Sequence, residues 1–94
     1  MDAILHLIAY DIASDRRLRR VARICEDFGV RVERSVFECD LTDVQFAAFW
    51  KRLSLEVSDD ADKVVDYPIG LLDKGKIKTM GHVGRNEPSL TYVL

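Results

Sequence analysis

The feature that most constrains the fold is a nearly uninterrupted apolar run near the start of the chain, residues 3–10 (Ala-Ile-Leu-His-Leu-Ile-Ala-Tyr). A strand points successive side chains to opposite faces, so a run that is apolar at consecutive positions predicts a strand covered on both faces. The run is also much shorter than the roughly 20 residues that a membrane-spanning helix needs. Residues 3–10 therefore predict a central strand in the sheet of a globular domain.

Length and composition restrict the class of protein. The 94 residues, 48% hydrophobic and 32% charged, predict a single folded domain over residues 1–94 and argue against disorder. Cys25 and Cys39 are the only cysteines and form no C-x-x-C pair, which argues against a disulfide framework or a structural zinc site. No basic segment or small-residue cleavage site flanks the apolar run, so we expect a cytoplasmic protein that does not interact with membranes.

An amphipathic helix is predicted directly after the first strand. Ser14 or Asp15 can cap its start, and Gly29 is placed to end it in the left-handed conformation that glycine tolerates. One side of this helix is apolar and the opposite side carries arginines. Five arginines fall within eight residues: Arg16, Arg17, Arg19, Arg20 and Arg23. Guanidinium groups suit phosphate recognition, although a solvated helix face explains the same pattern.

The remainder of the pattern alternates strands and one further helix. Residues 30–41 read as two short strands or one kinked strand, and Thr42-x-x-Gln45 is a capping box that opens a helix with an aromatic core stripe. Residues 63–69 and the stretch from Thr79 to Val83 are expected to be strands, as is the C-terminal segment of about residues 88–94.

This order predicts an α+β fold of the ferredoxin-like βαββαβ type, with an additional C-terminal strand. Two helices on one face leave the other face of the sheet open, yet the first strand is apolar towards both faces. A two-fold homodimer that packs sheet against sheet would cover it. The C-terminal strand has two possible partners, its own sheet edge or that of the second chain.

Asp11 is the most informative candidate for chemistry, because it stands where the central strand ends and the arginine-rich helix is about to begin. It fits a turn residue that accepts a backbone hydrogen bond and a functional carboxylate equally well. One carboxylate is a poor Mg²⁺ site by itself, but a two-fold axis near Asp11 would supply a second.

Three segments resemble the small CRISPR-associated adaptation family Cas2. They are Tyr10-Asp-Ile12, the helix segment Arg17-Leu-Arg-Arg-Val-Ala22, and Asp27-Phe-Gly-Val-Arg-Val-Glu-Arg-Ser-Val-Phe-Glu38. The resemblance is close over about residues 3–41 and looser towards the C-terminus. It implies a homodimer in which the C-terminal strand pairs with the partner chain, and which joins the CRISPR spacer integrase in spacer acquisition.

The resemblance also implies site residues. Asp11 would be the catalytic carboxylate and Mg²⁺ ligand of an endonuclease acting on RNA or double-stranded DNA. Arginines of the helix and the Ser-Val-Phe-Glu segment would line the nucleic-acid site. Together with Arg16 from the helix pattern, the expected nucleic-acid contacts are Arg16, Arg17, Arg19, Arg20, Arg31, Ser35 and Phe37.

One residue departs from the family pattern. Glu33 stands where the family usually has glutamine, and a negative charge near phosphate is unfavourable unless Glu33 pairs with Arg31 or Arg34, or faces the metal. A non-catalytic architectural adaptor and a toxin-type endoribonuclease of related fold remain alternatives. His82, in a segment flanked by glycines, has no assigned role.

Overall fold

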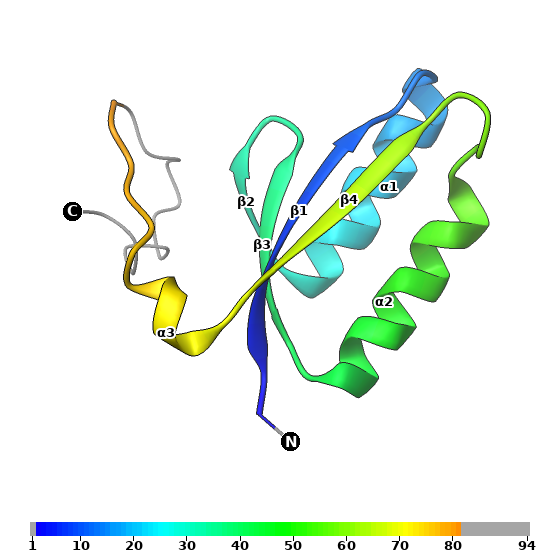
Figure 1. Cartoon of the computed structure of the whole chain (residues 1–94). Helices are drawn as coiled ribbons and strands as arrows, with labels where there is room; N and C mark the ends of the chain where they lie inside the picture. Colours follow the sequence, from blue (N-terminus) through cyan, green and yellow to red (C-terminus); the bar gives the residue numbers. More distant parts are fainter. Residues whose placement is uncertain (1, 82–94) are drawn as a thin grey trace.

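A four-stranded sheet with two long helices on one face makes up the domain (Figure 1). The computed structural model describes residues 2–81. The elements in chain order are β1 (Ile4–Asp11), α1 (Asp15–Phe28), β2 (Val30–Glu33), β3 (Val36–Leu41), α2 (Asp43–Glu56), β4 (Lys63–Ile69) and the short α3 (Leu71–Lys74). The ferredoxin-like α+β prediction is confirmed.

β1 occupies the interior of the sheet, as its apolar sequence predicts. The strand order is β2-β3-β1-β4, and every neighbouring pair is antiparallel. Residues 30–41 form a hairpin of two strands, so the single kinked strand is the wrong alternative. The irregular alternation that made this segment ambiguous is a shift in the β2–β3 register between Arg31 and Glu33.

The core lies between the sheet and the two helices. Ile8 of β1, Phe37 of β3, Val21 of α1 and Phe49 of α2 are each fully buried there. Close packing of one aromatic or aliphatic side chain from each of these elements fixes the helices against the sheet. The aromatic stripe predicted for α2 is therefore core.

His6 is a buried polar residue on the helix-facing side of β1. Its ring stacks on Phe46 of α2 with 4.5 Å between centroids, and its Nδ1 lies 2.8 Å from an Asp66 carboxylate oxygen on β4. Both the ring face and one ring nitrogen of this buried histidine therefore have partners.

The residues predicted to cap the two long helices do so at both N-terminal ends, whereas Gly29 at the end of α1 differs from its prediction. Ser14 caps α1 by accepting a hydrogen bond from the Arg17 amide, and Thr42 and Gln45 form the predicted capping box of α2. Gly29, in contrast, is not left-handed: its φ of −164° and ψ of −162° are extended. A Cβ at Gly29 would collide with the carbonyl oxygen of Glu38 and with the Cys39 Sγ, so close approach to β3 is what requires glycine here.

The other face of the sheet is only partly covered. Leu5 is buried, whereas Leu7, Ala9 and Val65 are half-buried and Tyr67 is 53% exposed. Part of the cover comes from α3, which was not predicted from the sequence; its Lys74 ammonium lies 3.6 Å from the Asp40 carboxylate at the end of β3. The homodimer that would cover the rest stays a prediction.

The sequence predictions for the C-terminal region are largely outside the described residues. Thr79–Gly81 form no strand, so the strand expected over Thr79–Val83 does not begin at Thr79. Residues 82–94, which include His82 and the expected C-terminal strand, lie beyond the part of the chain that the structure describes.

Replacing Gly29 with alanine tests the close approach between the end of α1 and β3. Because the added methyl would meet backbone and a buried sulfur, Gly29→Ala is expected to lower the free energy of unfolding by about 1–3 kcal/mol. Gly75→Ala is the matched control, because nothing lies within 4 Å of the Cβ position and φ is −74°. Urea unfolding of both variants makes the comparison; equal stability of the two would contradict the steric argument.

Candidate nucleic-acid and metal site

The carboxylate of Asp11 has no partner in the part of the chain that the structure describes. Asp11 is exposed at the end of β1, and within residues 2–81 its side chain forms no hydrogen bond or ion pair; its ladder neighbour on β4 is Lys63. The turn that follows does not use Asp11 either, because the Ala13 amide donates to Asp62 at 2.9 Å. The turn-residue interpretation of Asp11 therefore loses its basis, and an unpaired carboxylate remains.

Asp62 organises this end of the molecule and was missed from the sequence. It accepts hydrogen bonds from the amides of Ala13 and Ser58, at 2.9 and 2.8 Å, and from the Arg17 guanidinium through Nε at 2.7 Å and Nη2 at 3.1 Å. These donors hold the pKa of the Asp62 carboxyl well below its usual range, the Arg17 hydrogen bond contributing most. Asp62 thus joins the start of α1 to the loop before β4.

The arginines of α1 divide into engaged and unengaged groups. Arg17 is held by Asp62, and Arg20 lies 3.4 Å from the Glu56 carboxylate of α2. Arg16, Arg19 and Arg23 are exposed and form no ion pair with any residue from 2 to 81. Of the predicted nucleic-acid contacts on α1, Arg16 and Arg19 are the ones whose guanidinium groups are unoccupied.

The predictions for the β2–β3 hairpin need correction at Phe37. This side chain is 0% exposed and part of the core, so it cannot stack on a base, and the prediction of a direct contact is wrong. Arg31 lies over the Phe37 ring at 4.9 Å, pairs with Glu26 at 3.6 Å and donates to the Arg34 carbonyl. Ser35 is half-buried, and its carbonyl accepts from the Tyr10 amide at 3.1 Å.

Glu33, the departure from the family pattern, is exposed. Arg31 is engaged by Glu26, and Glu33 forms no ion pair within the described chain. Of the three conditions under which the charge of Glu33 would be tolerated, pairing with Arg31 or with Arg34 is thus not met within residues 2–81.

The metal-ligating residues of one chain do not make a Mg²⁺ site on their own. Among residues 2–81 no group of three or more histidine, cysteine, aspartate or glutamate side chains is placed to hold a metal ion. Asp11 contributes a single exposed carboxylate. A second carboxylate would have to come from a second chain.

The cysteines belong to the core. Burial raises the pKa of the Cys25 and Cys39 thiols to about 12, which removes the thiolate form that a nucleophile or metal ligand needs.

Glu38 is an unusual carboxyl on the same sheet face as Asp11. Its Oε2 is buried and has no hydrogen-bond partner among residues 2–81. Burial, followed by the charge of Asp40, raises the pKa of Glu38 from 4.5 to about 7, against the opposing charge of Lys74. The carboxyl group of Glu38 therefore changes between its protonated and its charged form near neutral pH.

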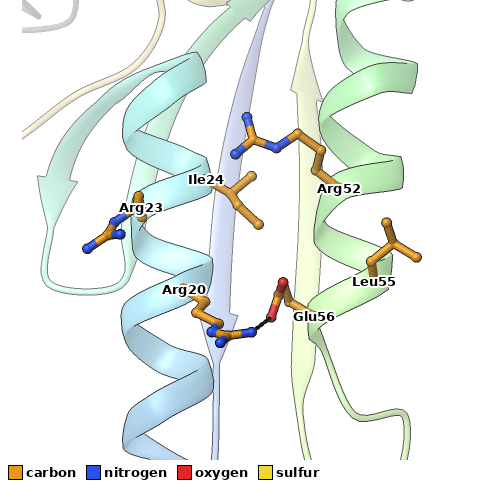
Figure 2. A pocket seen from close by; sticks show the side chains of 6 residues that line it. All are labelled: Arg20, Arg23, Ile24, Arg52, Leu55 and Glu56. Atoms are coloured by element: carbon orange, nitrogen blue, oxygen red, sulfur yellow. Dashed lines mark hydrogen bonds and ion pairs between the residues drawn. The ribbon is translucent and has the colours of Figure 1, made fainter.

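A groove runs between the two helices on the other side of the molecule. It has a volume of about 410 Å³ and is lined by Arg20, Arg23, Ile24, Arg52, Leu55 and Glu56, here called the α1–α2 groove (Figure 2). Arg52 of α2 also pairs with Asp27 of α1 at 3.0 Å. No sequence pattern points to Arg52, because the positions at which two helices face each other emerge only from their packing.

The fold and this set of side chains define a ferredoxin-like α+β domain with an unpaired carboxylate and free arginines near the start of its first helix. Residues 4–77 match the family model described as CRISPR associated protein Cas2, and the chain belongs to the Cas2 family. No helix within residues 2–81 is long and apolar enough to cross a membrane.

Two relatives and two solved structures show the extent of the similarity. The chain is 36% identical to the CRISPR-associated endoribonuclease Cas2 of Nitratidesulfovibrio vulgaris, over 99% of this chain and 96% of that protein. It is 32% identical to the CRISPR-associated endonuclease Cas2 of Halalkalibacterium halodurans, over 83% and 86%. Cas2 of Streptococcus pyogenes superposes with a TM-score of 0.74 at 32% identity, over 83% of this chain and all of that one. A hypothetical protein from Thermus thermophilus superposes with a TM-score of 0.80 at 28% identity, over 88% and 96%.

Because the pKa of Glu38 is raised in the folded protein, the free energy of unfolding is expected to depend on pH. The folded-state pKa is above the unfolded-state pKa, so the unfolded chain loses its proton first, and the free energy of unfolding falls as pH rises from about 4.5 to about 7. Glu38→Gln removes this loss and is expected to stabilise the protein at pH 8 by about 1–2 kcal/mol, after allowing for partial solvent exposure, with little effect at pH 4.

Urea unfolding from pH 4 to pH 8 measures the difference between Glu38→Gln and wild type. Glu33→Gln is the matched control for the same chemical change at an exposed position on the neighbouring strand. A difference that stays constant across this range would contradict the assignment of the titration to Glu38.

Proposed function

We propose that this chain is a CRISPR adaptation protein with endonuclease activity towards phosphodiesters of RNA or double-stranded DNA, acting as a two-fold dimer. The observation that carries the proposal is the free carboxylate of Asp11, exposed at the end of the central strand while Asp62 takes over the turn contacts. Membership of the Cas2 family and the endoribonuclease and endonuclease names of its relatives support it.

The proposed chemistry requires two chains. Asp11 supplies one carboxylate per chain, and Mg²⁺ is commonly held by one or two carboxylates together with waters and substrate phosphate oxygens. Two Asp11 side chains across a dimer axis suit that donor set. A Mg²⁺ ion bound there would supply Lewis-acid chemistry and a more acidic water. The residues of the chain itself would hold the ion and position the phosphodiester.

Arg16 and Arg19 are the proposed phosphate contacts. They are exposed, have no ion-pair partner in the described chain, and stand near the start of the helix that follows Asp11. Contacts of guanidinium groups with phosphate position a nucleic acid without reading its sequence, which suits a protein that captures DNA of varied sequence.

A non-catalytic adaptor that bridges DNA and the spacer integrase is the second candidate. The adaptor is favoured because Asp11 is the one metal ligand proposed per chain. In addition, no group of three or more candidate metal ligands occurs among residues 2–81. Both candidate functions use Arg16 and Arg19 to contact DNA, so a substitution at Asp11 is what distinguishes the nuclease from the adaptor.

Asp11→Asn is expected to reduce Mg²⁺-dependent cleavage of single-stranded RNA or duplex DNA by at least about 100-fold, because it removes the charge that binds the ion. Cleavage rates of identically purified proteins, with and without chelator, provide the measurement. Asp15→Asn is the matched control, an exposed aspartate at the first position of α1 that is expected to retain activity. Equal cleavage by wild type and Asp11→Asn, or cleavage by neither, would leave the adaptor as the function.

Replacing Arg16 and Arg19 together with alanine is expected to weaken binding to duplex DNA and to reduce the slope of log K against log salt by about 1–2, because each lost phosphate contact removes roughly 0.9. Fluorescence anisotropy at several salt concentrations measures the slope. Lys51→Ala with Lys76→Ala removes two exposed charges elsewhere and serves as control. An unchanged slope in the Arg16/Arg19 variant would refute the phosphate contacts.

A further inference from the structure

The cross-strand neighbour of Asp11 is a lysine whose charge the fold does not use. In the antiparallel ladder of β1 with β4, Asp11 stands directly opposite Lys63, the first residue of β4. Side chains at opposite positions leave the same face of a sheet, with their Cβ atoms roughly 5 Å apart. Lys63 is exposed and forms no ion pair with any residue from 2 to 81. An ammonium group without a partner in the described chain therefore accompanies the carboxylate of Asp11.

Alternation along β1 decides which face of the sheet carries these two side chains. His6 stacks on an aromatic ring of α2, and Tyr10 belongs to the core between the sheet and the helices, so the even-numbered residues of β1 face the helix layer. Asp11 consequently leaves the opposite face, and Lys63 leaves it with Asp11. The arginines proposed above as phosphate contacts belong to α1, in the helix layer (Figure 1). Lys63 is therefore a cation beside Asp11 on the sheet itself.

The backbone of Lys63 is held in place by the residue before it. Asp62, whose side chain is 0% exposed, accepts hydrogen bonds from the Ala13 amide and from the Arg17 guanidinium. These bonds tie the start of β4 to the turn that follows β1. Asp11 and Lys63 therefore project from fixed backbone positions, while the flexible four-carbon stem of the lysine lets its ammonium group move towards a ligand.

The charges of this pair suit an anion that also binds a divalent cation. An ammonium group and a Mg²⁺ ion at Asp11 would repel each other at a separation of a few ångströms unless an anion lay between them. A phosphate group has oxygens for both, since one oxygen can bind the ion while another accepts a hydrogen bond from the ammonium group. A two-fold dimer that joins two Asp11 side chains would also bring in two Lys63 side chains, whose charges would offset the repulsion between the carboxylates.

We infer that Lys63 is a further phosphate contact, whose ammonium group binds the phosphodiester that lies beside Asp11. The inference rests on the proposed function, because that function places nucleic acid at Asp11, and it adds a contact on the sheet to those made from α1. The alternative is a plain cross-strand ion pair between Asp11 and Lys63, in which the lysine affects stability and leaves nucleic-acid binding unchanged.

Binding of duplex DNA and of single-stranded RNA by the full chain, with chelator present to prevent cleavage, tests the contact. Lys63→Gln is expected to weaken binding at least about threefold, and to reduce the slope of log K against log salt by about 0.9 on duplex DNA or about 0.7 on a single strand. Lys63→Arg keeps the charge and is expected to bind as wild type does. Lys51→Gln, at an exposed lysine of α2, is the matched control that is expected to change nothing.

Fluorescence anisotropy at several salt concentrations measures the affinities and slopes. Both lysines are exposed, so none of these changes should unfold the protein. Sedimentation velocity of each variant checks that its oligomeric state is the same as that of wild type.

Asp11→Asn in the same assay locates the bound phosphate. With chelator present it is expected to tighten binding about two- to fivefold, because it removes a negative charge beside the phosphate. Asp43→Asn is the matched control and is expected to leave the affinity unchanged. Asp43 is an exposed aspartate that follows β3 at the opposite end of the sheet, where Leu41 pairs with Ile4.

Four results would overturn the inference. They are no binding of either nucleic acid by wild type, equal binding by wild type and Lys63→Gln, a loss in Lys63→Gln that Lys63→Arg or Lys51→Gln shares, and an affinity of Asp11→Asn no tighter than that of Asp43→Asn.

Cleavage assays with Mg²⁺ separate failure of this inference from failure of the proposed function. If wild type cleaves and Asp11→Asn does not, the endonuclease stands, and Lys63→Gln is expected to raise KM by the factor by which it weakens binding, with kcat within about threefold of wild type. An unchanged KM would contradict the contact. If wild type does not cleave, the endonuclease fails, while the binding assays still decide whether Lys63 contacts a phosphate beside Asp11.

Discussion

The four hydrogen bonds accepted by Asp62 are the interaction on which the rest of the site depends. Asp62 lies in the loop before β4, and its donors come from the turn after β1, from its own loop and from the first turn of α1. The turn after β1 is therefore held by Asp62, from a loop distant in the sequence, and not by Asp11. The side chain that performs the structural task, Asp62, is fully covered, while Asp11 is exposed.

The arginines of α1 look equivalent in the sequence but have different surroundings in the structure. Arg17 and Arg20 each face a carboxylate of the α2–β4 region, whereas Arg16 and Arg19 point to solvent one residue before each of them. An alternating use of this kind follows from the helical rotation of about 100° per residue, which turns neighbouring side chains away from each other. Arg17 and Arg20 fix α1 against its neighbours, whereas Arg16 and Arg19 have no ion-pair partner within residues 2–81. Paired and exposed arginines occur on one helix because one edge of α1 faces acidic residues and its outer face is exposed to solvent.

The parts of the structure predicted correctly from the sequence are those that local physics determines. The apolar run of β1, the Thr42–Gln45 capping box and the bounds of β4 depend on near neighbours in the chain. The wrong or missing predictions involve contacts between distant residues. A glycine at a helix end predicts a left-handed φ, whereas Gly29 is required because β3 lies close to it. The family motif predicts that Phe37 contacts nucleic acid, but residues distant in the sequence bury its side chain. Asp62 and Arg17 are 45 residues apart, and no sequence pattern links them.

The two surfaces of this sandwich differ in the kind of contact they suit. The open sheet face combines half-buried aliphatic side chains with Glu38, whose carboxyl is neutral or charged within the physiological range. Covering this face with a second chain would remove more water from Glu38 and favour its protonated form further, so association through the sheet would take up protons as pH rises towards neutrality. The helix face instead carries permanently charged guanidinium groups around aliphatic side chains. Because guanidinium groups keep their charge over this pH range, electrostatic contacts made there would depend on salt and hardly on pH.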